Sequence, residues 1–186
     1  MLVTQVVQQL SGVSAVMYFT TSILSPISSN SKLLSLGVMC FKIPMTILPA
    51  LIIERTGPKP LLILPTAFMS LCLVALAAGI NTDTPALAIL GITAFVAFFS
   101  VGLGPVTWVV LATSLPPHAR AAASSVALGI NWSFNFLVGA TFLPLQQWLA
   151  AGQRSKEGDV FFVFAATCAI GAWAIRKGYQ RLERID

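Results

Sequence analysis

Charged side chains are scarce in this sequence. Only 9% of its 186 residues are Asp, Glu, Lys or Arg, whereas 56% are hydrophobic. An average soluble domain carries about 25% charged residues. With so few polar side chains, a globule of this size cannot cover its surface for water. The composition therefore excludes an ordinary soluble domain and predicts an integral membrane protein.

Groups that carry catalysis or bind metals are equally scarce. The three cysteines, Cys40, Cys72 and Cys168, lie in apolar runs without metal-ligand spacing or a disulfide framework. The one histidine, His118, lies in a basic turn with no acid nearby, and the sequence has no phosphate-binding glycine loop. We therefore expect neither an enzyme nor a cofactor or metal site.

Long apolar runs dominate the rest of the chain. A helix of about 20 apolar residues crosses a hydrocarbon core about 30 Å thick, and six such runs follow one another. The runs are continuously apolar instead of alternating, and backbone groups in lipid must be paired within their segment, so they predict helices and not barrel strands. Residues 1–186 thus predict a single all-α membrane domain with six spans, Leu2 to Leu24, Leu33 to Ile53, Leu61 to Ile80, Ala86 to Thr113, Ala121 to Leu149, and Val160 to Ile175.

Basic residues lie mainly in alternate loops. Arg55, Lys59, Arg120 and the basic tail would share one side of the membrane, and fewer basic residues, near Lys32 and Lys156, the other. By the positive-inside rule, this distribution predicts that both termini are cytoplasmic. The net charge of +5 is then mostly a topology signal. It favours anionic lipid headgroups as partners, and not nucleic acid.

Acidic residues are absent from all six expected spans. Lys42, in contrast, lies about 15 Å along its helix from Lys32 at 1.5 Å per residue, and so near the bilayer centre. A lysine there costs roughly 2.5 to 3.5 kcal/mol. Several explanations stay open: Lys42 faces an aqueous cavity, pairs with an acid on a separate half, is neutral by desolvation, or lies in a span whose boundary is misplaced.

Three glutamines interrupt the first apolar run, in the stretch QVVQQLSGVSAV. On a straight helix Gln5, Gln8, Gln9 and Gly12 lie at spacings of three and four, so they form one polar stripe on a single face. Two interpretations stay open. In the first, the glutamines form hydrogen bonds to a neighbouring helix, each of which stabilises the contact by about 1 kcal/mol. In the second, they line a water-filled cavity that binds a polar solute.

Two other spans favour the cavity. Asn131 and Asn135 lie four residues apart on one helical face, and GLGPVTW places Pro105 ahead of Trp108, where it should kink or break the helix. A broken helix at membrane depth is tolerated only where protein or a cavity surrounds it. Amides both donate to and accept from hydroxyls, and tryptophan stacks on the apolar face of a sugar ring. Together these residues suit a neutral polyhydroxylated ligand.

Four motifs resemble those of one family, in the same order and spacing. The stretch from Gln5 resembles the seventh-helix pattern Q-x-x-Q-Q-x-S-G-x-N of sugar porters in the major facilitator superfamily. ERTGPK resembles that family's cytoplasmic D/E-R-x-G-R-R loop, GLGPVTW its tenth-helix G-P-G-P-x-x-W, and NWSFNF its eleventh-helix N-W-x-x-N-F. The resemblance covers almost the whole chain, but only helices seven to twelve of a twelve-helix family member.

The resemblance implies two six-helix halves around a central sugar site that opens alternately to each side of the membrane. Matched motif by motif, the substrate-binding positions are the paired glutamines Gln8 and Gln9, the nearby cavity residue Gln5, the tryptophan beside the sugar, Trp108, and the cavity asparagine Asn131. We include these positions in the expected site.

Several site positions depart from the family pattern. Ser14 replaces the asparagine that ends the first motif, Ser100 a tenth-helix glutamate, and Lys42 a cavity asparagine. All three belong to the expected substrate site. On a straight helix Ser14 lies opposite the glutamines, so its participation requires a break near Gly12, as in the family. Thr113 replaces a further acid, ahead of the cytoplasmic P-x-x-x-R.

A second set of matched residues lies at the expected cytoplasmic side. In ERTGPK, Glu54, Arg55 and Gly57 match the family loop, while Pro116 and Arg120 match its later cytoplasmic motif. The resemblance implies that these residues take part in gating. An ordinary positively charged loop is the alternative for Glu54 and Arg55.

The resemblance implies transport of a hexose or similar sugar by alternating access. With no acid inside the spans, facilitative transport is the simpler expectation than proton coupling. We expect an amino-terminal six-helix half or a second transporter chain as protein partner, in the plasma membrane or an organelle membrane such as the vacuole. Two alternatives stay open: a sugar sensor or regulator derived from the family, and a gene-model fragment without a function of its own.

Overall fold

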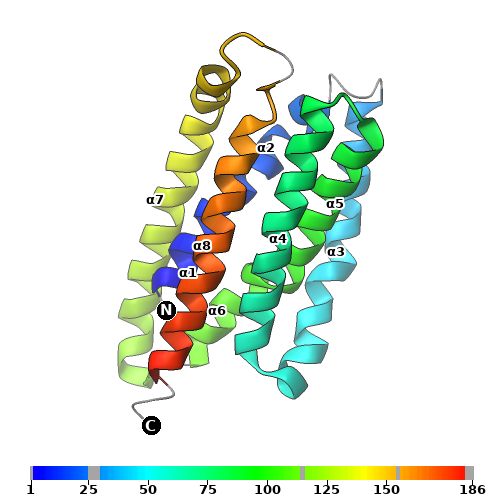
Figure 1. The fold of residues 1–186 in the computed structure, drawn as a ribbon. Helices are drawn as coiled ribbons and strands as arrows, with labels where there is room; N and C mark the ends of the chain where they lie inside the picture. The colour runs from blue at the N-terminus through cyan, green and yellow to red at the C-terminus, as the bar shows by residue number, and fades with distance from the viewer. Residues whose placement is uncertain (1, 25–29, 114–115, 154–155, 183–186) are drawn as a thin grey trace.

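The computed structural model describes residues 2–24, 30–113, 116–153 and 156–182, and this part of the chain forms a helical bundle (Figure 1). No strand occurs within these ranges. The helices are α1 (Leu2–Leu10), α2 (Val13–Leu24), α3 (Ser31–Thr56), α4 (Pro58–Asn81), α5 (Pro85–Val101), α6 (Leu103–Thr113), α7 (Pro117–Ala150) and α8 (Asp159–Leu182).

The first expected span is divided into α1 and α2. The division lies at Ser11 and Gly12, where Gly12 adopts φ = +81°, a left-handed conformation that a side chain disfavours. A Cβ at Gly12 would also lie 2.7 Å from the ring of Phe164. Both the backbone conformation and the lack of space therefore favour glycine at this position. The helix break that Ser14 needs in order to approach the glutamines is present.

A second division separates α5 from α6. Gly102 lies there with φ = −108° and ψ = −103°, and a Cβ at this position would lie 2.6 Å from the Cβ of Pro65 on α4. Pro105, in the first turn of α6, supplies no N–H to the helix. The break predicted from GLGPVTW is confirmed.

The closest helix packing lies around α4, which has α5 on one side and α8 on the other (Figure 1). Glycines permit this approach: a Cβ at Gly79 would lie 2.4 Å from the backbone nitrogen of Ala88, and one at Gly91 2.7 Å from that of Leu76. Small residues at a crossing let helix backbones come together within a membrane. The space around them is filled by fully buried apolar side chains, Met69, Leu73, Leu76, Ile92, Phe95 and Phe161.

In the part of the chain that the structure describes, five helical stretches are long and apolar enough to cross a membrane. They are Ser31–Thr56, Pro58–Asn81, Pro85–Thr113, Pro117–Ala150 and Asp159–Arg181. α1 and α2 are each shorter, but they follow one another along the bundle (Figure 1). The crossing predicted for Leu2 to Leu24 stays a prediction. The final helix continues to Leu182, beyond the expected end of its span at Ile175.

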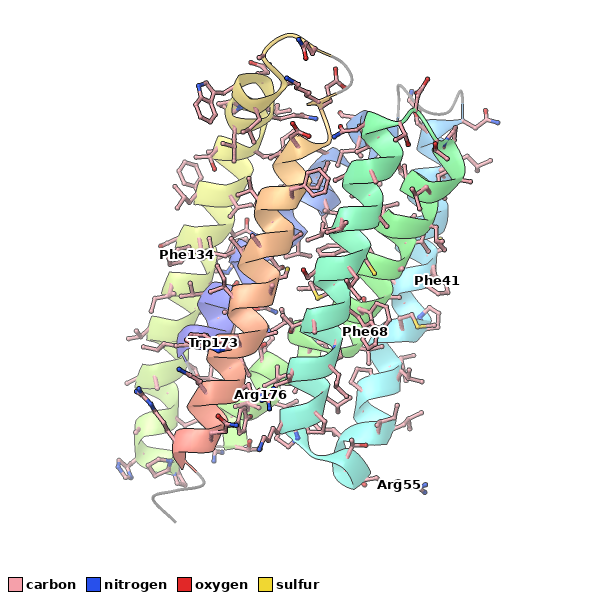
Figure 2. The ribbon with its side chains drawn as sticks, viewed as in Figure 1. Phe41, Arg55, Phe68, Phe134, Trp173 and Arg176 are labelled. Atoms are coloured by element: carbon pink, nitrogen blue, oxygen red, sulfur yellow. The ribbon has the colours of Figure 1, made fainter. Side chains whose placement is uncertain are left out.

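Basic side chains gather at one end of the bundle. The turn between α3 and α4, the start of α7 and the end of α8 all lie at the lower end in Figure 1. Arg55 and Arg176 are seen at this end in Figure 2, and Lys59 and Arg120 belong to the same segments. That this end faces the cytoplasm stays a prediction from the sequence.

Candidate functional site

The glutamines of α1 face the interior of the bundle. Gln5, Gln8 and Gln9 are 0%, 4% and 7% exposed, although α1 lies at the start of the chain. Their spacing of three and four places them on one side of α1, and hydrogen bonds from this side reach α6 and α7. The polar stripe predicted from the sequence is therefore turned inward.

Asn131 of α7 is the centre of the hydrogen-bond network around these glutamines. Its Nδ2 donates to Oε1 of Gln5 at 2.9 Å and to Oε1 of Gln8 at 2.8 Å. Its Oδ1 accepts a hydrogen bond from Nε2 of Gln9 at 2.9 Å. One buried amide thus holds all three glutamines, and it links α1 to α7 across 122 or more residues of sequence.

Ser14 joins the network from the start of α2. Its Oγ donates to Oε1 of Gln9 at 2.7 Å and accepts from Nδ2 of Asn135 at 2.8 Å. The hydroxyl of Tyr18 in turn donates to Oδ1 of Asn135 at 3.0 Å. The break at Gly12 is what lets Ser14 meet a glutamine that would lie opposite it on a straight helix.

Asn135 and Tyr18 extend the cluster beyond the residues predicted for the site. Asn135 lies one turn after Asn131, and Tyr18 lies one turn after Ser14. In each pair, the four-residue spacing indicates that the second residue lies on the same helix face as the first. Below, the polar cluster means Gln5, Gln8, Gln9, Ser14, Tyr18, Asn131 and Asn135.

The polar cluster also reaches the broken tenth-helix motif. Nε2 of Gln8 donates to the backbone carbonyls of Leu103 and Gly104, at 2.9 and 3.1 Å. These carbonyls belong to the first turn of α6, directly after the break at Gly102. The same helix carries Trp108, whose side chain is 36% exposed. α6 therefore places an accessible aromatic ring on a helix that the cluster holds.

Two buried polar atoms in the described part of the chain lack a hydrogen-bond partner: Nε2 of Gln5 and Oγ1 of Thr107. Gln5 and Thr107 are both fully buried. An unpaired buried donor is unfavourable by about 1–3 kcal/mol. Gln5 therefore keeps an amide donor, and Thr107 a hydroxyl next to Trp108 in sequence, that a ligand could pair.

The polar cluster contains only neutral amides and hydroxyls. Each amide both donates and accepts hydrogen bonds, as does each hydroxyl, whereas a buried ion would need a charged partner. Within the described ranges, no group of three His, Cys, Asp or Glu could hold a metal ion. The chemistry of the cluster suits hydroxyl groups of an uncharged ligand.

Lys42 and Ser100 lie outside this network. Lys42 is half-buried on α3, in a stripe with the buried residues Ser35, Val38 and Pro49 at helical spacing. It therefore faces the bundle and not the opposite surface of α3. Ser100 is buried on α5, where its Oγ donates to the carbonyl of Val96 in the same helix at 2.8 Å. The structure does not join Ser100 to the cluster.

The residues expected at the gate lie away from the polar cluster. Glu54 and Arg55 are exposed at the end of α3, and Gly57 forms the following turn with φ = +75°. Pro116 and Arg120 are exposed at the start of α7. All five belong to the basic end of the bundle, as Figure 2 shows for Arg55.

Comparisons of sequence place these features in a family context. The chain matches the family model described as "Sugar (and other) transporter" over residues 1–178. It is 32% identical over 180 residues to the facilitated trehalose transporter Tret1 of Drosophila virilis, covering 90% of this chain and 19% of that protein. It is 27% identical over 177 residues to the sugar transporter ERD6-like 6 of Arabidopsis thaliana, covering 88% and 35%. The chain thus spans about a fifth to a third of these relatives.

Solved structures show the same fold. The D-xylose–proton symporter superposes with a TM-score of 0.84 at 24% identity, covering 94% of this chain and 40% of that one. The inward-open conformation of the xylose transporter XylE from E. coli gives a TM-score of 0.80 at 23% identity, covering 95% and 36%. The bundle is therefore half of a major facilitator superfamily fold.

Proposed function

Because this chain belongs to the sugar (and other) transporter family, we propose that it forms one six-span half of a pathway that carries a hexose or similar neutral sugar. The chain is a multi-pass membrane protein of a transporter family and not an enzyme. In the proposal, the polar cluster and Trp108 form one wall of the sugar site. Alternating access supplies the movement, and no coupled ion is invoked.

The unpaired Nε2 of Gln5 is the observation that carries the proposal. If the glutamines served only to join helices, the fully buried amide of Gln5 would be expected to use its donor. A sugar hydroxyl can accept from this nitrogen and donate to a neighbouring amide oxygen. The Oγ1 of Thr107, also unpaired, would add a hydroxyl from α6 to such a site.

The breaks in two spans support the proposal. Gly12 separates α1 from α2 and Gly102 separates α5 from α6, so each span has a short segment that can tilt by itself. Gln8 bonds the first turn of α6, which couples the two broken spans at the polar cluster. A sugar that exchanged with these hydrogen bonds would change the coupling between them.

A second six-helix half is part of the proposal. In the most apolar stretch of each helix, only 11% of the residues of α3 and 22% of those of α7 are buried within this chain, whereas 50% of those of α4 are buried. Asn135 and Trp108, at the site itself, are also partly exposed. An amino-terminal half, or a second transporter chain, would cover this side and enclose the sugar. We place both termini on the cytoplasmic side from the distribution of basic residues.

Uptake by a chimera tests the proposal. This chain would replace the corresponding half of the Drosophila trehalose transporter, and trehalose and glucose uptake would be measured in proteoliposomes. We expect uptake that Gln9→Ala weakens without reducing insertion, because Gln9 bonds both Asn131 and Ser14. If Gln9→Ala left uptake unchanged, we would conclude that the glutamines only join neighbouring helices. Binding without uptake would favour a sugar sensor.

Lys42 is proposed to face the aqueous pathway of the assembled transporter. Its place on the inward stripe of α3 supports this position over a lipid-facing one. With the native cysteines replaced, Lys42→Cys should react with a water-soluble thiol reagent, whereas Leu71→Cys, on the exposed apolar face of α4, should not. If neither cysteine reacted with the reagent, position 42 would not face the aqueous pathway.

A further inference from the structure

A groove lies between the start of α4 and the end of α8, at the basic end of the bundle. Its volume is about 450 Å³, and it is lined by Lys59, Pro60, Ile63, Leu64, Arg176 and Gln180. The lining combines two cations and an amide with three apolar side chains, and none of the six is acidic. The polar cluster contributes no residue to this groove.

The groove lies where both of its helices pass from charged to apolar sequence. In α4, Lys59 is followed by the apolar run from Leu61; in α8, the apolar run ends at Ile175, directly before Arg176. Trp173, 57% exposed, precedes Arg176 by one turn, and tryptophan is enriched at the membrane interface. Figure 2 shows Arg176 on the lower part of α8, beside the start of α4. From this pattern we infer that the two cations lie at headgroup depth.

The apolar side of the groove continues toward the membrane interior. Leu64 lines the groove and is 57% exposed, and Leu71, two turns further along α4, is 64% exposed. Residues seven apart lie on nearly the same face of a helix. An acyl chain could follow this exposed face from the groove toward the bilayer centre, while a free anion would leave it uncovered.

We propose that this groove binds an anionic phospholipid. The phosphate pairs with Arg176, whose guanidinium presents two parallel donors to phosphate oxygens, and with Lys59. Gln180 donates to the headgroup, and the acyl chain packs along Ile63 and Leu64. Basic pockets between transmembrane helices on the cytoplasmic side bind anionic headgroups in this manner.

Native mass spectrometry of the purified full chain, titrated with phosphatidylserine or phosphatidylcholine, tests the proposal. We expect phosphatidylserine to be retained in preference. Each of Lys59→Gln and Arg176→Gln should weaken its retention about fivefold, the effect of one basic residue near an anionic surface. The double variant should lose the preference. The charge-conserving pair Lys59→Arg with Arg176→Lys should keep most of it, which separates loss of charge from misfolding.

Lys177→Gln is the matched control. It removes the same charge from the same helix, but the ammonium of Lys177 lies over the ring of Trp173, 4.2 Å from its centroid, and Lys177 does not line the groove. We expect it to leave retention within twofold of wild type. A loss equal to that of Arg176→Gln would overturn the proposal in favour of diffuse charge attraction. Equal retention of phosphatidylcholine, or equally tight binding of soluble glycerophosphoserine, would overturn it as well.

Discussion

Where α4 meets α5, a glycine leaves no room for even one extra carbon, whereas the seven polar side chains of the polar cluster lie where α1 and α2 meet α7. The first contact is held by apolar side chains of α4, α5 and α8 at close range. The second is held by directional bonds through Asn131 and leaves Gln5 with an unused donor. Close packing specifies one arrangement, while neutral amides can exchange one partner for another.

The difference indicates a division of labour within the half. The packed side has no spare volume at its glycine contacts, so it can serve as a rigid support. The polar side contains the residues proposed to bind sugar, and through Gln8 it bonds the first turn of α6, directly after the break at Gly102. Substitutions that act on one side and not on the other can test this contrast.

The largest effect is expected from Gly91→Ala on the packed side. The new Cβ would lie 2.7 Å from the backbone nitrogen of Leu76, and backbone cannot rotate away, so the free energy of unfolding should fall by about 1–3 kcal/mol. Gly129→Ala is the control, because open space surrounds that helical position. Detergent-induced unfolding followed by circular dichroism measures both. Equal stability of the two variants would contradict close packing at α4 and α5.

A smaller loss is expected from Asn131→Leu on the polar side. The change deprives Gln5, Gln8 and Gln9 of a shared partner. The loss should be about 1–1.5 kcal/mol in total, the lower part of the range for unpaired buried groups, because the glutamines can rearrange. Ser133→Ala, at an exposed position of the same helix, is the comparison. If both variants unfolded alike, Asn131 would not be the centre of the network.

The smallest effect is expected from Thr107→Val. The hydroxyl has no partner within the described chain, so its removal breaks no hydrogen bond and should leave the unfolding free energy unchanged or raise it. Ser14→Ala, which breaks bonds to Gln9 and Asn135, should cost about 1 kcal/mol. The same unfolding titration separates them. A larger loss for Thr107→Val would show that its hydroxyl is already paired.

Much of this contrast could be predicted from the sequence. The spacing of Gln5, Gln8 and Gln9 predicted their shared face. The spacing of Asn131 and Asn135 predicted a second polar face, which would contact a ligand or a neighbouring helix. Pro105 and its glycines predicted the break before Trp108. These features depend on local periodicity and backbone chemistry, which a single sequence carries directly.

Other parts of the site depend on contacts between distant segments. The meeting of Ser14 with Asn135, and of Gln8 with the backbone of α6, depends on the angle at Gly12 and on how the helices pack. The closeness of Gly91 to Leu76 follows from the same tertiary arrangement. Ser100 matches a site position of the family in sequence, but its hydroxyl bonds its own helix and does not join the polar cluster. Helix spacing predicts faces, and it does not predict which faces meet.

Equilibrium binding of labelled neutral mono- and disaccharides tests the central claim most directly when it is measured on the chimera of this chain with the other half of the trehalose transporter, because the proposed site needs both halves. Wild type would be measured beside Gln9→Ala and Ser133→Ala. The account predicts saturable binding of at least one sugar, weakened about tenfold by Gln9→Ala, the effect of losing about one good hydrogen bond, and unchanged by Ser133→Ala. Binding that Gln9→Ala leaves intact, or that no sugar saturates, would contradict the assignment of the polar cluster as a sugar site.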